Sequence, residues 1–545
     1  MRSNLRNWLL LAIFTIAWFC NLGYRHLAKS DEGRYAEIPR EMVASGDWLT
    51  PRLNGFKYFE KPPLQYWTTA AAFSVFGQTE WAARLWSGLT GFFGVLLVFW
   101  FGNRLLGPPV GLYGAAVVAS SAIYVSIGHM LTLDMGLTLF MSASVFSIAL
   151  AQRDQASEAE RRRWMLLAWT AAALAVLSKG LIGIVLPAGA VALYVLVERD
   201  WKVLARLHTV SGALLFAAIA APWFVAVSIV NPEFFRFFFI HEHFERFLTH
   251  VHRRDEPAWY FIPVLLAGVL PWILSLFPAL WRAWRRSPDV TFQPKRFLLL
   301  WCVLVFVFFS ASGSKLSSYI LPIFPALALL IGSALAFSGP RFALAQAAVA
   351  GLLAVALATA ASQGSRFATG RLPAELLAAY APWLLVAAVA LLAAAGVSAW
   401  LSLRARPQAA VLALAFGGFV SVQVATSGYE ELSPAYSAYH IVQKMRDQLR
   451  PNVPFYVVHT FDHTLLFYLG RTVTMVGFKD ELAQPIAWEP KNFLPDTTAF
   501  ARAWEGDSEA FAMFKSHHLD RFLETHPLSM RIVARDASHV IVKKP

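Results

Sequence analysis

About thirteen runs of apolar residues, each near the length of a membrane-spanning helix, constrain the fold of this chain more than any other feature. The composition agrees with them, because 57% of the 545 residues are hydrophobic and only 15% are charged. We therefore expect an all-α polytopic membrane domain. The predicted spans are residues 5–23, 81–105, 110–126, 133–151, 164–178, 181–197, 210–230, 259–281, 297–312, 319–337, 342–361, 382–401 and 409–426.

The basic residues indicate how these spans are oriented. When the spans alternate across the bilayer, one set of short connections collects most of the arginines, among them Arg161, Arg162, Arg163, Arg285 and Arg404. The positive-inside rule places that side, and with it the N-terminus, in the cytoplasm. An odd number of spans then places the C-terminus on the opposite side. Orientation also accounts for the net charge of +13, so we expect no nucleic-acid partner.

The composition changes abruptly after residue 427. Residues 1–427 form the predicted transmembrane domain, in which residues 24–79 make a long loop outside the cytoplasm. Residues 428–545 have mixed charges, alternating runs at 455–459 and 531–533, and a helical pattern at 435–449. They predict a small extracytoplasmic α/β domain, whose histidines we expect to be solvated.

Three ionisable residues at the ends of predicted spans are candidates for a functional site. Asp134 begins the fourth span, Lys179 follows the fifth, and Lys315 lies between the ninth and tenth. All three fall on the extracytoplasmic side, where they converge with the loop 24–79. A charge costs about 2.5–3.5 kcal/mol at a helix centre, which favours a functional reason for each. The alternative is that each side chain simply snorkels at a helix end.

The loop 24–79 holds the densest group of polar residues. Its candidates for binding or catalysis are Asp31, Arg34, Tyr58, Glu60 and Lys61. Residues 36–43 have helical polarity, and we expect them to form an amphipathic helix on the membrane surface. Asp31 follows the first span closely, so it should lie at the depth of the lipid headgroups.

Two histidines after the seventh span raise the question of a metal. His241 and His243, with Glu60 from the long loop, offer the imidazole and carboxylate ligands that zinc accepts. The alternative is a hydrogen-bonded cluster that faces lipid headgroups, because an H-x-H pair alone does not define a metal site. A divalent cofactor such as zinc therefore stays open.

Short motifs resemble those of a known family. In the loop 24–79 they are Asp31-Glu32-x-Arg34-Tyr35-Ala36, Arg40-Glu41-Met42, Gly46-Asp47-Trp48, Asn54-Gly55 and Lys61-Pro62-Pro63-Leu64. Further along they are Leu133-Asp134, Ser178-Lys179-Gly180, His241-Glu242-His243-Phe244 and Lys315. The set is similar to that of the bacterial branch of the protein O-mannosyltransferase superfamily, and most closely to that of the lipid A aminoarabinose transferases.

The resemblance implies a GT-C glycosyltransferase of the bacterial inner membrane that inverts the anomeric centre. The implied donor is undecaprenyl phosphate carrying 4-amino-4-deoxy-L-arabinose, and the implied acceptor is a lipid A phosphate at the periplasmic face. Asp31 matches the family's essential aspartate, and Asp134 matches its second acidic position. Lys61, Arg34 and Tyr58 fall where the carrier phosphate is held.

The chemistry of the residues is consistent with these roles. A phosphate leaving group gains negative charge during transfer, and fixed cations such as Lys61 and Arg34 stabilise it. Lys179 and Lys315 join the predicted phosphate site because they emerge at the same face. For a hydroxyl acceptor Asp31 would be the general base. For a phosphate acceptor it would orient the acceptor, pair with the donor's ammonium group or bind a cation.

Two other interpretations stay open. A transferase that moves a hexose from a polyprenyl phosphate to protein or to another glycolipid would share the same kind of first loop. A lipid transporter or flippase belongs to a different class, and it favours inverted repeats and charges near the membrane midplane. In this chain the charges collect instead at one face, beside a long loop.

Overall fold

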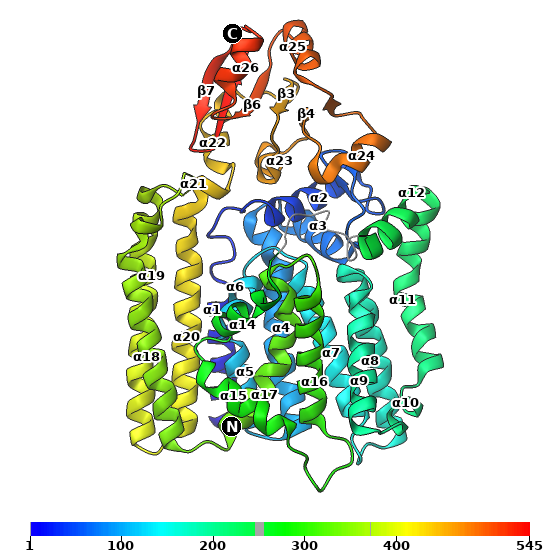
Figure 1. Ribbon diagram of the computed structural model, residues 1–545, viewed down its shortest axis with the longest axis vertical. Coiled ribbons are helices and arrows are strands. Elements are labelled where there is room, and N and C mark those ends of the chain that lie inside the picture. Colours follow the sequence, from blue (N-terminus) through cyan, green and yellow to red (C-terminus); the bar gives the residue numbers. More distant parts are fainter. Residues whose placement is uncertain (1, 246–255, 371) are drawn as a thin grey trace.

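The fold is a bundle of long helices with an α/β domain at one end (Figure 1). The computed structural model describes the backbone of residues 2–245, 256–370 and 372–545. Two helices, α2 (Asp31–Ser45) and α3 (Leu64–Phe76), lie across the bundle beneath the α/β domain. The chain begins at the far end of the bundle, so its two termini lie at opposite ends of the molecule.

The bundle follows from the apolar runs, because a backbone in lipid must satisfy its hydrogen bonds internally. In the described residues, eight helices are long and apolar enough to cross a membrane: α4 (Glu80–Leu106), α7 (Asp134–Ala151), α11 (Thr209–Val230), α16 (Pro294–Ala311), η3 (Ser317–Ile323) with α17 (Phe324–Ala336), α18 (Pro340–Ser362), α19 (Ala374–Leu403) and α20 (Pro407–Gly428). Two bent pairs bring the number to ten: α5 (Val110–Val118) with α6 (Ala122–Gly128), and η2 (Ala258–Tyr260) and α14 (Phe261–Gly268) with α15 (Ile273–Trp284). Short helices connect them, namely α10 (Lys202–Ala205), α12 (Glu233–Phe235), η1 (Arg236–Glu245) and η4 (Gly364–Phe367).

Among the described residues, ten of the about thirteen predicted spans are long and apolar enough to cross a membrane when each bent pair counts as one span. The other three predicted spans coincide with helices α1 (Arg2–Phe19), α8 (Glu158–Lys179) and α9 (Ile182–Glu198). Helix α9 has 17 residues, or about 26 Å at 1.5 Å per residue, which is shorter than the hydrocarbon core. Helix α8 begins with the sequence EAERRR, so its first turns are suited to an interface rather than to lipid.

The two bent spans face each other at their breaks. Helices α5 and α6 meet at 65°, and α14 and α15 meet at 112° next to Pro271, which has no N–H to donate. The backbone N–H of Ala122 donates to the carbonyl of Leu270 at 3.2 Å. The indole of Trp272 donates to the hydroxyl of Ser120 at 2.9 Å. The contact between Ala122 and Leu270 therefore satisfies a backbone N–H at the start of α6 and a backbone carbonyl just after α14, both of which lack a partner in their own helix.

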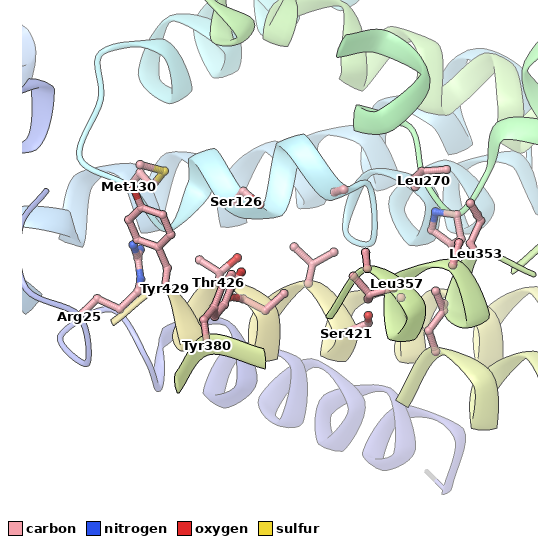
Figure 2. Close-up of a pocket in the computed structure, with 18 residues that line it drawn as sticks. Arg25, Ser126, Met130, Leu270, Leu353, Leu357, Tyr380, Ser421, Thr426 and Tyr429 are labelled. Carbon is pink, nitrogen blue, oxygen red and sulfur yellow. The ribbon is translucent and has the colours of Figure 1, made fainter. Parts of the chain in front are cut away.

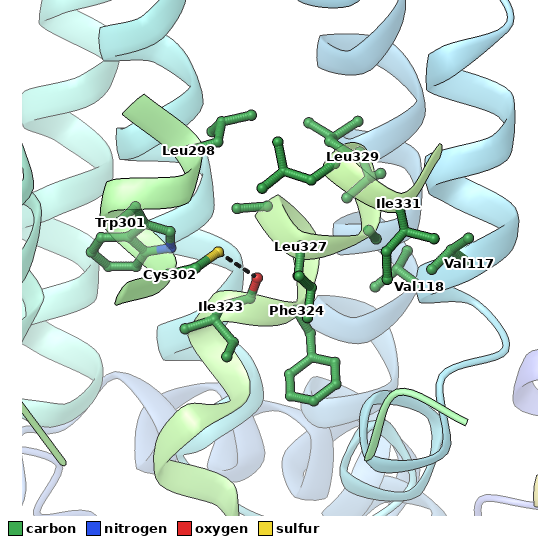
Figure 3. Close-up of a cluster of buried hydrophobic side chains, with 14 of the residues drawn as sticks. Val117, Val118, Leu298, Trp301, Cys302, Ile323, Phe324, Leu327, Leu329 and Ile331 are labelled. Carbon is green, nitrogen blue, oxygen red and sulfur yellow. Dashed lines mark hydrogen bonds between the residues drawn. The ribbon is translucent and has the colours of Figure 1, made fainter. Parts of the chain in front are cut away.

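A buried apolar core joins α16, α17 and α5 (Figure 3). The indole of Trp301 donates to the carbonyl of Pro322 at 3.1 Å, and the thiol of Cys302 lies 3.7 Å from the carbonyl of Ile323. Both carbonyls belong to η3, whose open backbone thus finds partners inside the core. The two cysteines, Cys302 and Cys20, are free.

The arginine-rich connections gather at the end of the bundle where the chain begins (Figure 1). Arg286 and Arg296 pair with Glu198 at 2.6 and 2.5 Å, which joins the α15–α16 connection to the end of α9. Asp154, in the α7–α8 connection, accepts the backbone N–H of Thr291 at 2.6 Å. These contacts confirm that three of the basic connections share one face.

Helix α2 is longer than predicted and lies in a different environment. Residues 36–43 are helical, as predicted, but most of them are buried between α3 and α23 (His463–Leu469) of the α/β domain instead of lying open on a surface. Gly33 makes this packing possible. A Cβ atom at Gly33 would lie only 2.6 Å from the backbone nitrogen of Thr464.

A hairpin between α2 and α3 contacts the α/β domain. Strands β1 (Arg52–Leu53) and β2 (Phe56–Lys57) are antiparallel and are joined by Asn54 and Gly55, which have positive φ angles of 56° and 80°. The carboxylate of Glu41 accepts both of their N–H groups, at 2.6 and 2.9 Å. The Asn54 amide exchanges two hydrogen bonds with the backbone of Val473, at 3.0 and 2.8 Å. The hairpin therefore joins α2 to the C-terminal part of the chain.

The C-terminal part contains a six-stranded sheet, which confirms the predicted α/β class. The strand order is β5-β4-β3-β6-β8-β7, with β5, β4, β3 and β6 parallel and β8 antiparallel to both β6 and β7. The strands are β3 (Phe455–Val458), β4 (Thr474–Val476), β5 (Phe493–Leu494), β6 (Phe511–Lys515), β7 (Arg531–Arg535) and β8 (His539–Lys543). The remaining helices are η7 (Asp480–Leu482), α24 (Ala483–Trp488), α25 (Thr497–Gly506) and α26 (Leu519–Thr525).

The single helix predicted at residues 435–449 is broken into pieces. The structure has η5 (Tyr429–Leu432), α21 (Ser433–Tyr436), α22 (Tyr439–Gln443) and η6 (Arg446–Gln448). Ser437 is extended, with φ −136° and ψ 138°, and its hydroxyl accepts the N–H of Tyr439. The N–H of Ala438 donates to the Thr464 hydroxyl at 2.8 Å instead of to its own helix. Contact with α23 therefore overrides the helical pattern.

A buried carboxylate fastens α2 to the bundle. Glu32 accepts hydrogen bonds from Nε and Nη2 of Arg84 in α4, at 2.7 and 2.9 Å, and both side chains are almost fully buried. It also accepts the backbone N–H groups of Ala28 and Leu131, each at 2.9 Å. Burial alone would raise the pKa of Glu32, but the charge and hydrogen bonds of Arg84 outweigh it and hold the pKa at about 2.

We predict that Glu32→Gln destabilises the protein by about 3–5 kcal/mol, because it leaves the Arg84 charge buried without its partner. The folded-state pKa lies below the ordinary 4.5, so the stability contributed by Glu32 is complete above about pH 4.5 and is lost as the pH falls toward 2. Thermal unfolding in detergent, followed from pH 7 to pH 3, measures both effects. The exposed Glu524→Gln should change little, and equal melting temperatures for Glu32→Gln and wild type would contradict the prediction.

Candidate functional site

Two predicted site residues, Asp31 and Arg34, form an ion pair at the start of α2. Nη1 of Arg34 donates to Oδ1 of Asp31 at 3.0 Å. The Asp31 side chain is 41% exposed and that of Arg34 only 7%. The aspartate is therefore open to a ligand, whereas the arginine is held inside the protein.

A glutamate from the α/β domain holds Arg34 on its other side. Glu481 in η7 accepts from Nε and Nη2 of Arg34, at 3.0 and 2.6 Å, in a bidentate pair. His463 lies 2.7 Å from the same carboxylate, so the prediction that the C-terminal histidines are solvated is wrong for this one. Burial alone would raise the pKa of Glu481, but Arg34 and His463 together hold it at about 2. Arg34 is thus fixed by two carboxylates from distant parts of the chain.

Two tyrosines beside Arg34 carry hydroxyls without a partner. Tyr58 and Tyr66 are buried, and neither hydroxyl has a hydrogen-bond partner among the described residues. Burial raises the pKa of both well above the ordinary value, and the charges of Arg34 and Glu60 act on both rings. An unpaired buried hydroxyl is costly, so these two are suited to a ligand that accepts hydrogen bonds. Tyr58 was predicted from the motif; Tyr66 was not.

The turn with Glu60 and Lys61 lies beside the end of α8. Nζ of Lys61 donates to the Glu60 carbonyl at 2.9 Å and lies 3.9 Å from its carboxylate. Phe59 packs in one apolar cluster with Leu177, two residues before Lys179. The turn therefore brings Lys61 to the end of the bundle that also carries Lys179.

Two of the three charged residues at span ends are in contact, which agrees with the prediction that they converge. Asp134 and Lys179 form a direct ion pair. Nζ of Lys179 also lies 4.6 Å from the centre of the Tyr319 ring in η3, a cation–π contact. Lys315 lies in the connection between α16 and η3. It is buried, and it donates to the carbonyl of Ser312 at 2.6 Å. The ends of α7, α8 and α16 thus contribute to one charged face.

The loop group and the bundle group are joined through Glu32. Glu32 follows Asp31 directly, and it binds the backbone of Leu131, three residues before Asp134. The segments that carry the two predicted aspartates are therefore tied together by one buried carboxylate. The side chains of His241 and His243 lie outside the described residues, so the zinc set that they form with Glu60 stays a prediction.

A separate apolar cavity of about 670 Å³ lies between α6, α18, α19 and α20 (Figure 2). Eight of its eighteen lining residues are leucines or alanines, and Tyr380 and Tyr429 lie toward one end. Arg25 lines the same end and is 3% exposed, and its guanidinium donates to the carbonyl of His129 at 2.5 Å. None of the predicted site residues is in the lining, and the apolar runs alone could not reveal the cavity.

The comparisons with known proteins first establish the class. A sequence model for dolichyl-phosphate-mannose-protein mannosyltransferases matches residues 5–238. The fold is similar to that of the oligosaccharyltransferase of Archaeoglobus fulgidus, with a TM-score of 0.51 and 12% identity over 93% of this chain and 69% of that one. The fold, the long first loop and the charged face define a polytopic membrane glycosyltransferase of the GT-C type.

Closer relatives establish the family. The crystal structure of ArnT from Cupriavidus metallidurans bound to undecaprenyl phosphate matches with a TM-score of 0.93 and 38% identity, over 99% of this chain and 98% of that one. A model of the aminoarabinose transferase C-terminal domain matches residues 441–544. The chain belongs to the ArnT family of aminoarabinose transferases.

Curated relatives agree over a shorter stretch. The undecaprenyl phosphate-alpha-4-amino-4-deoxy-L-arabinose arabinosyl transferase of Edwardsiella ictaluri is 35% identical over 334 residues. A relative of the same name from Sodalis glossinidius is 37% identical over 329 residues. The first alignment covers 60% of this chain and 59% of the relative, and the second covers 60% and 58%. The aligned part therefore spans less than two thirds of these relatives.

We predict that Tyr58→Phe and Tyr66→Phe each weaken the binding of a lipid carrier phosphate by about tenfold or more, since a hydrogen bond to a charged group contributes about 1.5–3 kcal/mol. Stability should stay equal or rise, because the lost hydroxyl has no partner in the free protein. Titration of purified protein with the carrier, beside thermal unfolding, measures both quantities. Tyr113→Phe, in α5, is the matched control. Unchanged affinity in both loop variants would remove the tyrosines from the phosphate site.

Proposed function

We propose that this chain transfers 4-amino-4-deoxy-L-arabinose from undecaprenyl phosphate to a phosphate of lipid A, at the periplasmic face of the bacterial inner membrane. The observation that carries the proposal is the likeness, over 99% of the chain, to ArnT bound to undecaprenyl phosphate. The names of the curated relatives support the sugar. The lipid A acceptor and the membrane follow from the family resemblance.

The first step is binding of the carrier phosphate by residues of the loop. Lys61 supplies a compact cation, and Arg34 supplies a guanidinium that Asp31 and Glu481 hold in place. The hydroxyls of Tyr58 and Tyr66 are free to donate to phosphate oxygens. Because these donors are fixed before the substrate arrives, they stabilise the charge that develops on the leaving phosphate without reorganising.

The transfer itself breaks one bond and forms one. An oxygen of the acceptor phosphate attacks the anomeric carbon of the sugar, and the bond from that carbon to the carrier oxygen breaks. The electron pair of that bond leaves with undecaprenyl phosphate, and attack from the opposite side inverts the anomeric centre. An ionised acceptor phosphate is itself a nucleophile, so little general-base help is needed.

The carboxylates of Asp31 and Asp134 then serve to orient the substrates and to balance charge. Asp31 is exposed enough to meet the 4-ammonium group of the sugar or to orient the acceptor, while Asp134 is held by Lys179. Lys179 and Lys315 add positive charge at the same face, where two phosphate-bearing substrates must meet. The apolar cavity of Figure 2 is suited to hydrocarbon chains rather than to a sugar.

Reconstituted transfer tests the proposal. Purified full-length protein is mixed with synthetic undecaprenyl-phosphate aminoarabinose and lipid A. The mass of the lipid A product is then measured by mass spectrometry. The expected product is lipid A with one added aminoarabinose. A product that forms only with a hexose carrier, or only on a protein acceptor, would support the hexose transferase instead.

We predict that Asp31→Asn lowers the transfer rate by at least about a hundredfold, if the carboxylate acts in the transition state. If it only pairs with Arg34, the loss should stay within about 1 kcal/mol, as for exposed ion pairs. Initial rates at saturating donor separate the two cases. Asp289→Asn, at an exposed site in the α15–α16 connection, is the control. More than about a tenth of wild-type activity would leave Asp134 as the candidate carboxylate.

We predict that Lys61→Ala abolishes measurable transfer while the protein still inserts and folds, because Lys61 is a partly buried side chain at the end of a fixed turn and is not part of the apolar core. Turnover is measured at limiting and at saturating carrier. The exposed Lys491→Ala should behave as wild type. Normal turnover by Lys61→Ala at both carrier concentrations would show that the residue is structural.

We predict that the C-terminus lies in the periplasm, because the arginine-rich connections gather at the opposite end of the bundle. A C-terminal alkaline phosphatase fusion should therefore be active, and a green fluorescent protein fusion should be dark. The reverse pattern would overturn the proposed orientation.

A further inference from the structure

Three potential metal ligands meet where the bundle joins the α/β domain, outside the proposed transfer site. His26 lies in the connection between α1 and α2, Glu430 lies in η5, and His440 lies in α22. One ligand atom from each residue lies within 4.8 Å of the other two. The three residues come from three separate segments, so only the fold brings them together.

Hydrogen bonds already hold these side chains together. Nδ1 of His26 lies 2.5 Å from Oε1 of Glu430, and the backbone N–H of His26 donates to Oε2 at 2.8 Å. The hydroxyl of Ser433 lies 3.0 Å from Oε1 of Glu430 and 2.7 Å from Nε2 of His440. The Tyr439 ring stacks on His26 with centroids 3.5 Å apart, which fixes the imidazole plane.

We propose that His26, Glu430 and His440 bind a zinc ion. Two imidazoles and one carboxylate are a ligand set that zinc accepts, with a fourth position for water or a hydroxyl. Zinc holds such ligands at about 2.0–2.2 Å, so in a tetrahedral site the ligand atoms lie roughly 3.4 Å apart. The His26–Glu430 contact would open by less than about 1 Å, and His440 would close from within 4.8 Å. Ser433 lies between them as a candidate fourth ligand.

The surroundings also suit a metal. All three residues are only partly buried, so an ion can reach them from the solvent side. The carboxylate supplies a negative charge that offsets part of the charge of the ion.

A zinc ion here would fasten the start of the first loop to the α/β domain. His26 lies five residues before Asp31, and between them the N–H of Lys29 donates to the carbonyl of Tyr436 at 2.8 Å. The metal would therefore hold the approach to the transfer site and would not take part in the transfer. The site shares no residue with the predicted set of Glu60, His241 and His243.

Zinc counting on the full-length protein tests the proposal without any transfer assay. The purified protein is stripped with a chelator, dialysed against micromolar zinc and analysed by mass spectrometry of the metal. His26→Asn and His440→Gln should each bind one zinc fewer than wild type. His440→Gln keeps a side chain that can bond to Ser433, so it should still fold. Glu60→Gln and the exposed His517→Ala should keep this zinc.

Cobalt gives a second readout on the same samples. Cobalt-loaded wild type should show visible absorption bands of a four-coordinate site, and His440→Gln should lose them. Equal zinc content in wild type and a folded, monodisperse His440→Gln would overturn the proposal. So would a wild-type protein that binds no zinc. Either result leaves the proposed transfer function untouched, because that function is measured separately.

Discussion

The buried ion pair between Glu32 and Arg84 is the contact on which the candidate site depends. It takes a carboxylate from the loop and a guanidinium from α4 out of solvent, and its remaining acceptor positions are filled by the N–H groups of Ala28 and Leu131. Such a pair is stable only when every member is satisfied, because a lone buried charge is costly. Here it sets the start of α2, and with it the position of Asp31.

The same contact links the loop to the bundle's own charged groups. Leu131 leads into α7, whose first residue Asp134 pairs with Lys179 at the end of α8. A fully buried glutamate thus helps to position the two predicted aspartates. This arrangement is typical of sites in which residues from flexible connections must be held in a fixed geometry.

The α/β domain is part of the site rather than an attachment to it. Glu481 holds Arg34 from above, and Val473 binds the hairpin through Asn54. In the proposed function the carrier phosphate binds beside Arg34, and the domain fixes Arg34 through Glu481. Separation of the domain from the bundle would therefore release Arg34 as well as the hairpin.

The sequence predicted the features that depend on local patterns. Apolar runs located the helices and alternation located strands β3 and β7. The charged span ends predicted that Asp134 and Lys179 share one face, and the structure brings them into contact. The predicted spans 164–178 and 181–197 also coincide with parts of α8 and α9, although α9 has only 17 residues and α8 begins with charges.

Features that depend on distant partners were not predictable in this way. Polarity alone suggested a surface helix at residues 36–43, since nothing local shows that α23 covers it. Glu481 and His463 come from a region without a recognisable motif, and they meet Arg34 only in the folded chain. In the sequence Tyr66 is indistinguishable from an ordinary core residue. Only the structure shows that its hydroxyl has no partner among the described residues.

Mass spectrometry of lipid A from living cells tests the central claim most directly. The chain is expressed in a Gram-negative strain that makes the undecaprenyl-linked aminoarabinose donor but lacks its own transferase. The account predicts lipid A that carries added aminoarabinose with the wild-type chain and unmodified lipid A with Asp31→Asn. Unmodified lipid A in cells that hold both the donor and the folded wild-type protein would contradict it.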